Sequence, residues 1–301
     1  MKRISLALMV LLLFLTGCSG PSGILSLFAT QTPTPTVTPT VTPTFTPTAT
    51  STPTLTPTVT ITPSPTPTAT KVFTVQGPGS IICPILLYHH IKIPSVANAL
   101  FVTPDDFRAQ MQFLRDNGYT PIPVSLLVKA IDFGAPLPEK PVVISFDDGD
   151  ITIYTAAFPI MKEFGYVGVN YLVGNRLGSD GFLSVDQIKE MIAAGWEVGS
   201  HSMTHSDLTQ SGEVEWELTQ SKANLEEKLG VKVDTFAYPF GTFSSEIINE
   251  VSKIYSAGMG LGVFLEQRPG DIYYLWRRPV DYGIDMATFA AYLTPPATPV
   301  P

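Results

Sequence analysis

The four histidines and the adjacent aspartates that end an apolar run near the middle of the chain are the residues of this 301-residue sequence best suited to chemistry. The histidines form two groups, His89-His90 and His201 with His205, and the acidic pair is Asp147-Asp148. Imidazole nitrogens and carboxylate oxygens are typical ligands of catalytic zinc, and both groups also transfer protons. The sequence therefore predicts a metal site with proton-transfer groups beside it.

The spacing within these groups suggests how they would share one ion. Four residues separate His201 from His205, which on a helical turn would place both imidazoles on one side, about 6 Å apart along the axis. Asp147 and Asp148 would repel each other at a strand end unless one meets a cation, and in an extended segment their side chains point in different directions. We therefore expect Asp148 to join the two histidines in a zinc-type site, with Asp147 facing the substrate.

Apolar segments precede each of these polar groups. Residues 81–88, 142–146 and 196–199 are expected to be strands, and the polar residues follow their ends. Further strands are expected at 167–173 and 234–238, and helices at 103–117, 152–164, 184–195, 213–229, 244–255 and 286–293. This alternation predicts a parallel α/β fold, and the number of repeats favours a barrel over an open sheet. Functional groups of such folds lie at the carboxyl ends of the strands.

The N-terminal segment has the pattern of an export signal. Lys2 and Arg3 precede an apolar run from residue 4 to 15, which is too short for a permanent membrane span, and small residues follow. Residues 15–18, Leu-Thr-Gly-Cys, resemble the bacterial lipoprotein signal in which the cysteine receives a lipid. We expect residues 1–18 to be a lipoprotein signal peptide, with Cys18 as the lipidation site that anchors an extracytoplasmic protein to the membrane. An ordinary signal peptide is the alternative.

Composition divides the rest of the chain. Ten prolines alternate with threonines between residues 30 and 70, a pattern that cannot build a core, so residues 19–70 are predicted to be a disordered spacer in extended polyproline form. Residues 71–294 are long enough for one folded domain, and 295–301 are predicted to be a disordered tail. If Cys18 is lipidated, Cys83 has no partner for a disulfide, and we expect it to be a buried apolar residue.

Charge restricts the possible partners. Beyond residue 70, 16 Lys and Arg face all 26 Asp and Glu, which gives a net charge of −10. Such a surface repels phosphate backbones, so nucleic acid is not an expected partner. A neutral or cationic substrate, such as an amino sugar polymer, is easier to accommodate than an anionic one.

Three segments carry a resemblance to a known family. Residues 145–149 (SFDDG), 201–205 (HSMTH) and 236–241 (FAYPFG) resemble the first three motifs of the polysaccharide deacetylases, also called the NodB-homology or carbohydrate esterase family 4 group. The similarity extends over about residues 81–293. It implies a distorted (β/α)7 barrel and the metal-dependent removal of acetyl groups from N-acetylated sugar polymers or O-acetylated xylan, with a monomer and an N-acetylglucosamine-containing glycan as the expected assembly and substrate.

The same resemblance implies roles for individual residues. Asp147 would be the general base that deprotonates the attacking water, and Asp148, His201 and His205 would hold the divalent metal, most simply zinc. The backbone N–H of Phe240 would stabilise the oxyanion. The adjoining Tyr238 and Pro239 are expected to contact the substrate.

The proton donor and the residue that orients the base are less clearly marked. The chain has no histidine after His205, and residues 87–91 (LYHHI) match the subgroup that resembles poly-N-acetylglucosamine deacetylases, in which an early histidine is the acid. This assigns His89 as the general acid, with His90 as the alternative. Arg277 is expected to steady Asp147, with its neighbour Arg278 as the alternative.

Asp150 departs from the family pattern, which usually has an aromatic residue after Asp-Asp-Gly. Its additional negative charge would be unfavourable near a substrate site. If Asp150 blocked the site, the protein would be a catalytically silent glycan-binding module tethered to the envelope. A second alternative is an Fe(II) oxygenase with two histidines and one carboxylate.

Overall fold

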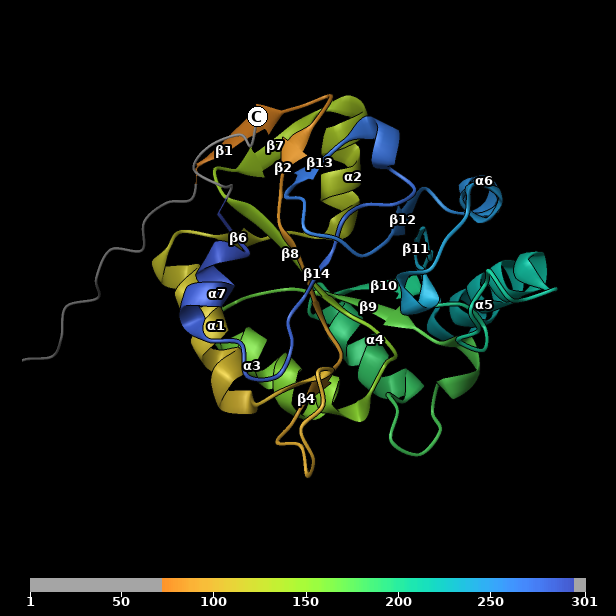
Figure 1. The fold of residues 1–301 in the computed structure, drawn as a ribbon, viewed down its shortest axis with the longest axis horizontal. Coiled ribbons are helices and arrows are strands. Elements are labelled where there is room, and N and C mark those ends of the chain that lie inside the picture. The colour runs from red at the N-terminus through yellow and green to blue at the C-terminus, as the bar shows by residue number, and fades with distance from the viewer. Residues whose placement is uncertain (1–71, 295–301) are drawn as a thin grey trace, which may run out of the picture. The chain divides into compact units, whose positions relative to one another are not determined.

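The computed structural model describes residues 72–294. The expected signal peptide, the lipidated Cys18, the Thr/Pro-rich spacer and the C-terminal tail lie outside the described residues. Within 72–294, no helix combines the length and the apolar character needed to cross a membrane. Figure 1 shows a central sheet with helices packed around it.

A curled parallel sheet forms the centre of the fold. Its strands follow the order β12-β11-β10-β9-β8-β3-β14, with β6 beside β8, and every pair is parallel. The strands are β3 (Ile85–Tyr88), β6 (Thr120–Pro121), β8 (Pro141–Phe146), β9 (Val169–Leu172), β10 (Glu197–Ser200), β11 (Thr235–Ala237), β12 (Ala257–Met259) and β14 (Arg278–Pro279). A parallel bridge between Met259 and Leu275 connects β12 to the segment that leads into β14. The prediction of a distorted (β/α)7 barrel is therefore confirmed.

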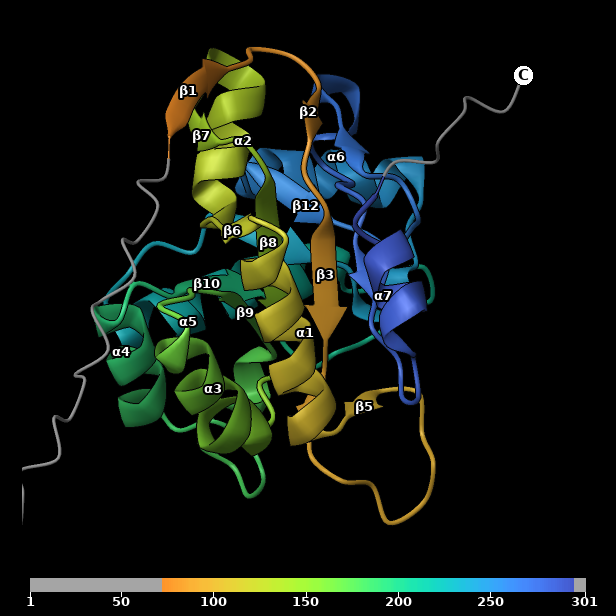
Figure 2. The same ribbon diagram turned by 90° about the vertical axis from the view of Figure 1, so that its left-hand side faces the viewer.

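Helices pack on the outside of this sheet. They are α1 (Pro104–Asp116), α2 (Val124–Phe133), α3 (Phe158–Glu163), α4 (Val185–Ala193), α5 (Val214–Leu229), α6 (Ser245–Ile254) and α7 (Met286–Ala291), with short helices η1 (Ile153–Ala157), η2 (Gly174–Arg176), η3 (Pro239–Gly241) and η4 (Pro269–Asp271). Figure 2 shows β3 at the front, with α1 and α7 on its two sides. Each expected helix is present, although the boundaries differ by a few residues.

Helix starts follow the signals in the sequence. The Thr103 hydroxyl accepts a hydrogen bond from the Asp106 N–H, and Pro104 occupies the first turn of α1, where a missing N–H costs nothing. Ser184 and Gln187 form a reciprocal capping box at the start of α4. These caps explain why the helix starts were predictable.

Other elements differ from the expectation. The single strand expected at 81–88 is two strands, β2 (Ile81–Ile82) and β3, interrupted at Cys83-Pro84, because β2 pairs with β13 (Glu266–Gln267) outside the barrel. Helix α2 was not predicted, because no side chain caps its start and its largely apolar sequence obscures the helical period. Two further small sheets pair β1 (Phe73–Gln76) with β7 (Ala135–Pro138) and β4 (His90–Ile91) with β5 (Phe101–Val102).

Apolar side chains fill the space between the sheet and the helices. Phe107 of α1, Phe146 of β8 and Trp196 before β10 are buried and pack ring against ring. Cys83 is fully buried, as expected, and burial raises the pKa of its thiol. A core of this kind provides a rigid scaffold for the groups at the strand ends.

Candidate active site

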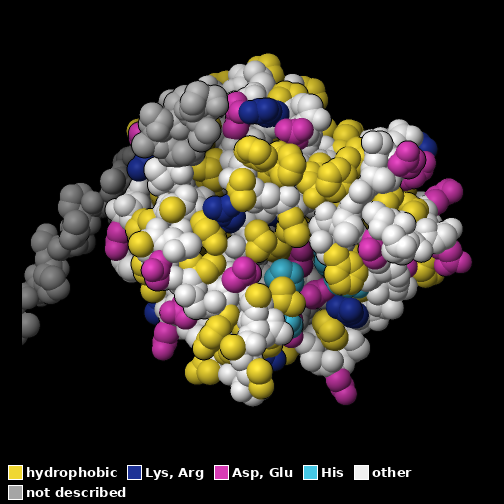
Figure 3. All heavy atoms as spheres, viewed as in Figure 1, with side chains coloured by type: hydrophobic (Ala, Val, Ile, Leu, Met, Phe, Trp, Pro, Cys, Tyr) yellow, Lys and Arg dark blue, Asp and Glu magenta, His cyan; other side chains and the backbone are white. Residues whose placement is uncertain are grey.

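The polar residues at the strand ends converge on one cavity of about 370 Å³. Among its lining residues are His89, Asp147, Asp148, His201, His205, Tyr238, Phe240, Leu261, Arg277 and Asp281. Figure 3 shows histidine and acidic side chains together near the middle of one face, with hydrophobic side chains around them. The position at the carboxyl ends of parallel strands is the one expected for this fold class.

Three of the lining residues could hold a metal ion. One ligand atom each from Asp148, His201 and His205 lies within 4.8 Å of the others. His201 Nδ1 lies 2.8 Å from the Ala237 carbonyl oxygen, an arrangement in which Nδ1–H donates and Nε2 remains free for a metal. The pKa of His205 is lowered to about 4, mainly because the ring is buried and secondly because His201 lies beside it. This imidazole is therefore neutral at pH 7, as a metal ligand must be. The donor set fits a divalent cation such as zinc.

The segment that carries the two histidines is a loop, and the expectation of a helical turn is wrong. Ser202 and His205 have φ values of 62° and 64°, in the left-handed region that side chains other than glycine rarely occupy. Each such residue costs roughly 1 to 3 kcal/mol, so the surrounding structure must hold the loop in place. The imidazole rings still converge, with centroids 4.8 Å apart. A spacing of four residues therefore brought them together without a helix.

The backbone turns at Asp148, so the two adjacent aspartates do not lie in an extended segment as expected. Asp148 has a φ of 69°, and its carboxylate lies 3.2 Å from His205 Nε2. The Arg176 guanidinium donates to the same carboxylate oxygen at 3.1 Å. Sequence reasoning missed Arg176, whose position just after β9, at the same end of the sheet, was the available signal.

Asp147 is buried and paired with Arg277. The guanidinium donates from Nη1 to Oδ1 at 2.6 Å and from Nη2 to Oδ2 at 2.8 Å, and the Arg277 side chain is fully buried. Burial alone would raise the pKa of Asp147, but Arg277, together with His201 and His89, outweighs it and lowers the pKa to about 2. Arg278 lies elsewhere, with its guanidinium 4.1 Å from the centre of the Tyr292 ring. Of the two candidate arginines, Arg277 is the one in contact with Asp147.

Loss of this pair should destabilise the fold in a pH-dependent way. Arg277→Met leaves a buried carboxylate without a partner, which should lower the free energy of unfolding at pH 7 by about 3 to 5 kcal/mol. The pKa of Asp147 in the folded protein lies below its ordinary value of 3.8, so the stabilisation by the pair is present above about pH 4 and is lost as the pH falls toward 2. Urea unfolding of wild type and variant should therefore show a smaller difference at pH 3 than at pH 7.

Arg278→Met is the matched control for that experiment. It removes a neighbouring guanidinium that stacks on Tyr292 and does not touch Asp147. We expect it to change stability by less than about 1 kcal/mol. A difference between wild type and Arg277→Met that stays constant from pH 7 to pH 3 would contradict the role of this ion pair.

The two adjacent histidines point to different surroundings. His89 lines the cavity, and burial lowers its pKa against the opposing effect of Asp147 and Asp148. His90 Nδ1 lies 3.0 Å from Asp150 Oδ2, outside the cavity lining. The geometry therefore distinguishes His89 from His90.

Asp150 is largely buried and does not line the cavity. Its carboxylate accepts hydrogen bonds from the Thr152 N–H, at 2.8 Å, and from the Thr152 hydroxyl, in addition to its contact with His90. The concern that its charge obstructs a substrate is therefore not supported. The alternative of a silent binding module loses the observation on which it rested.

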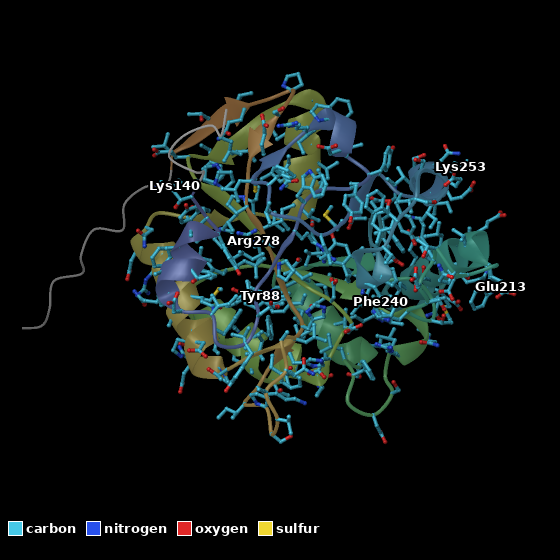
Figure 4. The ribbon with its side chains drawn as sticks, viewed as in Figure 1. Tyr88, Lys140, Glu213, Phe240, Lys253 and Arg278 are labelled. Atoms are coloured by element: carbon cyan, nitrogen blue, oxygen red, sulfur yellow. The ribbon has the colours of Figure 1, made fainter. Side chains whose placement is uncertain are left out.

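Phe240 forms part of the cavity wall and is exposed over 61% of its surface. Its φ of 60° bends the backbone within η3, and its ring packs 4.6 Å from that of His205. Figure 4 shows Phe240 toward the middle of this face, while Glu213 lies at its edge. The backbone at Phe240 is thus close to the histidine cluster.

Tyr238 and Pro239 differ in their relation to the cavity. Tyr238 lines it, but its hydroxyl donates to the Tyr273 carbonyl at 2.7 Å. Pro239 is buried and is not among the lining residues in the part of the chain that the structure describes. Tyr238 can thus offer a ring surface, whereas Pro239 shapes the turn that precedes Phe240.

Comparisons with known proteins agree with this geometry. A family model described as polysaccharide deacetylase matches residues 134–256. The Bacillus subtilis protein YxkH, whose name places it among the polysaccharide deacetylases, is 31% identical over 219 residues, which cover 70% of this chain and 75% of YxkH. The chain belongs to the polysaccharide deacetylase family. These deacetylases are hydrolases that act on carbon–nitrogen bonds, so the oxygenase alternative is wrong.

Two further matches are a relative whose name specifies its polymer and a solved crystal structure. The poly-β-1,6-N-acetyl-D-glucosamine N-deacetylase of Staphylococcus epidermidis is 26% identical over 183 residues, covering 56% of the present deacetylase and 62% of the relative. The crystal structure of BC0361, a polysaccharide deacetylase from Bacillus cereus, matches with a TM-score of 0.65 at 29% identity, covering 71% of this chain and 70% of that one. The fold of the deacetylase is thus that of the solved family members.

Proposed function

We propose that this protein is a divalent-metal-dependent deacetylase of an N-acetylated extracellular polysaccharide that contains N-acetylglucosamine. The observation that carries the proposal is the convergence of Asp148, His201 and His205 beside the buried Asp147–Arg277 pair in one cavity. The substrate of the Staphylococcus epidermidis relative, as its name gives it, supports the choice of polymer.

The metal site would supply the electrophile. Asp148, His201 and His205 would hold the ion, most simply zinc, which when bound lowers the pKa of water and polarises the acetyl carbonyl. The hydrogen bond from His201 to Ala237 fixes the orientation of that ring.

The residues around the metal site would handle the protons. The low pKa of Asp147 keeps the carboxylate ionised and ready to accept a proton, while Arg277 holds it in one orientation. Asp147 would then pass this proton on, and His89, which lines the same cavity, would take up a proton and deliver it to the leaving amine. The Phe240 N–H would donate to the oxyanion.

The proposed location follows from the N-terminal sequence. Cys18 would receive the lipid and become the new N-terminus when the residues before it are removed, which would anchor the chain to the cell membrane. Residues 19–70 would act as a spacer that carries the domain outward. At roughly 3.1 Å per residue, the Thr/Pro-rich part of this spacer, some 40 residues between positions 30 and 70, would span about 120 Å when fully extended. The domain would then reach extracytoplasmic polymers.

Acetate release is the direct test of this proposal. We expect the zinc-loaded protein to release acetate from poly-β-1,6-N-acetylglucosamine oligomers, compared in parallel with chitin oligomers, peptidoglycan and acetylated xylan by mass spectrometry. Release from xylan alone would move the activity to O-acetyl groups. No release from any of the four at full metal occupancy would refute the proposal.

Replacement of the two neighbouring histidines, His89 and His90, should have different effects on kcat. His89→Ala should lower kcat by about 10² to 10⁴-fold, because it removes the group that protonates the leaving amine. His90→Ala is the control, since His90 contacts Asp150 outside the cavity, and it should change kcat by less than about threefold. A larger loss in His90→Ala than in His89→Ala would reverse the assignment.

A further inference from the structure

Glu217 on α5 is a buried charged residue for which the proposed mechanism has no role. Its side chain is only 3% exposed, although α5 lies on the outside of the barrel. A buried carboxylate is costly unless hydrogen bonds compensate for its lost hydration. Its partners therefore indicate what this residue does.

The hydrogen bonds of the Glu217 carboxylate connect it to the loop between the two histidines. Glu217 Oε2 accepts from the Met203 N–H at 2.8 Å and from the Thr204 N–H at 2.9 Å, and Oε1 accepts from the Thr204 hydroxyl. One carboxylate thus binds two successive backbone amides of the segment that connects His201 to His205. Hydrogen bonds to a charged acceptor are among the stronger ones in proteins.

The same face of α5 contacts both loops beside the metal site. Ser221 and Asn224 follow Glu217 at intervals of four and three residues, so the three side chains share one face of the helix. The Ser221 hydroxyl lies 2.7 Å from the Ser200 hydroxyl at the end of β10, and Asn224 Nδ2 donates to the Gly174 carbonyl at 2.8 Å. Helix α5 therefore serves as a polar support for the carboxyl ends of β9 and β10.

We propose that Glu217 is a positioning residue that holds the backbone of residues 202–204 so that His205 can meet Asp148 and His201. The proposal rests on the metal site of the proposed function. Ser202 and His205 both have left-handed φ values, a costly conformation that the hydrogen bond from the His205 N–H to the Ser202 hydroxyl, at 2.9 Å, and the contacts with Glu217 together hold in place. His201 is already fixed by the Ala237 carbonyl, so the effect of Glu217 falls chiefly on His205.

Zinc affinity of the full chain is the measurement that tests this role. Competition titration with a chromogenic chelator should show that Glu217→Ala binds zinc about 10 to 100-fold more weakly than wild type, as is typical when a partner that orients a ligand is lost. Glu217→Gln should stay within about threefold, because its amide oxygen can accept both N–H groups while its NH₂ donates to the Thr204 hydroxyl.

Glu226→Ala is the matched control on the same helix. Glu226 also holds a loop, by accepting from the Val233 N–H at 3.0 Å, but that loop lies outside the cavity lining. Glu226→Ala should leave zinc affinity unchanged even if it lowers the melting temperature as much as Glu217→Ala does. If Glu217→Ala does not fold, Thr204→Val can be measured in its place. It removes only the hydrogen bond from the Thr204 hydroxyl to Glu217 Oε1 and should weaken zinc binding by about two to fivefold.

The outcomes separate this inference from the proposed function. If wild type binds no zinc, the metal site itself is wrong and the role of Glu217 falls with it. If wild type binds zinc and either Glu217→Ala or its substitute Thr204→Val binds equally well, the positioning role is overturned while the metal site stands. Equal losses in Glu217→Gln and Glu217→Ala would also overturn it, because the glutamine retains the hydrogen bonds.

Discussion

Asp147→Asn should lower the rate of acetate release by about 10² to 10⁴-fold while zinc remains bound. Asparagine has nearly the same shape as aspartate but cannot accept the proton from the attacking water. The metal should stay, because Asp147 is held by Arg277 and the proposed ligands are Asp148 and the two histidines. Steady-state kinetics and the zinc content of the same preparation would measure both effects.

Asp150→Asn provides the comparison for this experiment. Asp150 lies three residues further along the chain, and its carboxylate faces Thr152 and His90 rather than the cavity. Its replacement should change kcat by less than about threefold. If Asp147→Asn loses its zinc, Asp147 is a ligand and not the base, and if it retains near wild-type kcat, another group accepts the proton.

Removal of the metal should reduce acetate release to background. Metal ions typically contribute several kcal/mol of transition-state stabilisation, which corresponds to about 10³-fold or more in rate. Dialysis against a chelator should abolish activity, and addition of one equivalent of zinc should restore it. His205→Ala should have a similar effect, because it removes one of three proposed ligands.

The chelated protein should remain folded, which distinguishes metal loss from unfolding. The core of the barrel does not depend on the three ligand residues, since apolar side chains fill it on both sides of the sheet. Circular dichroism before and after chelation should therefore agree. Activity that survives complete removal of the metal, confirmed by elemental analysis, would exclude the proposed mechanism.

Much of the site could be predicted because its residues follow recognisable strands. Phe146 ends a buried apolar run, so the position of Asp147-Asp148 at a strand end could be predicted from hydrophobicity alone. Asp147 and Arg277 are 130 residues apart in the sequence. On sequence alone, two neighbouring arginines, Arg277 and Arg278, are candidates for the partner of Asp147. Only the structure distinguishes them, because side-chain direction depends on how β14 joins the barrel.

The remaining features depend on tertiary contacts that leave weak local signals. The loop conformation of residues 201–205 could not be predicted from the spacing of two histidines, since a helical turn and a strained loop both bring them together. Glu217 resembles an ordinary surface glutamate of a charged helix, and its burial depends on a loop thirteen and fourteen residues earlier. Arg176 had a weak signal in its position just after an expected strand, but its contact with Asp148 depends on the pairing of β9 with β8.

The position of Arg277 in the chain also links the active site to the closure of the barrel. Arg277 directly precedes β14, the strand that closes the barrel against β3, so Asp147 obtains its buried counter-charge only when the last part of the domain has docked. A nascent or truncated chain that ends before residue 277 would contain all three proposed metal ligands but would leave the Asp147 carboxylate unpaired in an open barrel. Completion of the barrel and pairing of the Asp147 carboxylate therefore depend on the same long-range contact, made by the last part of the domain.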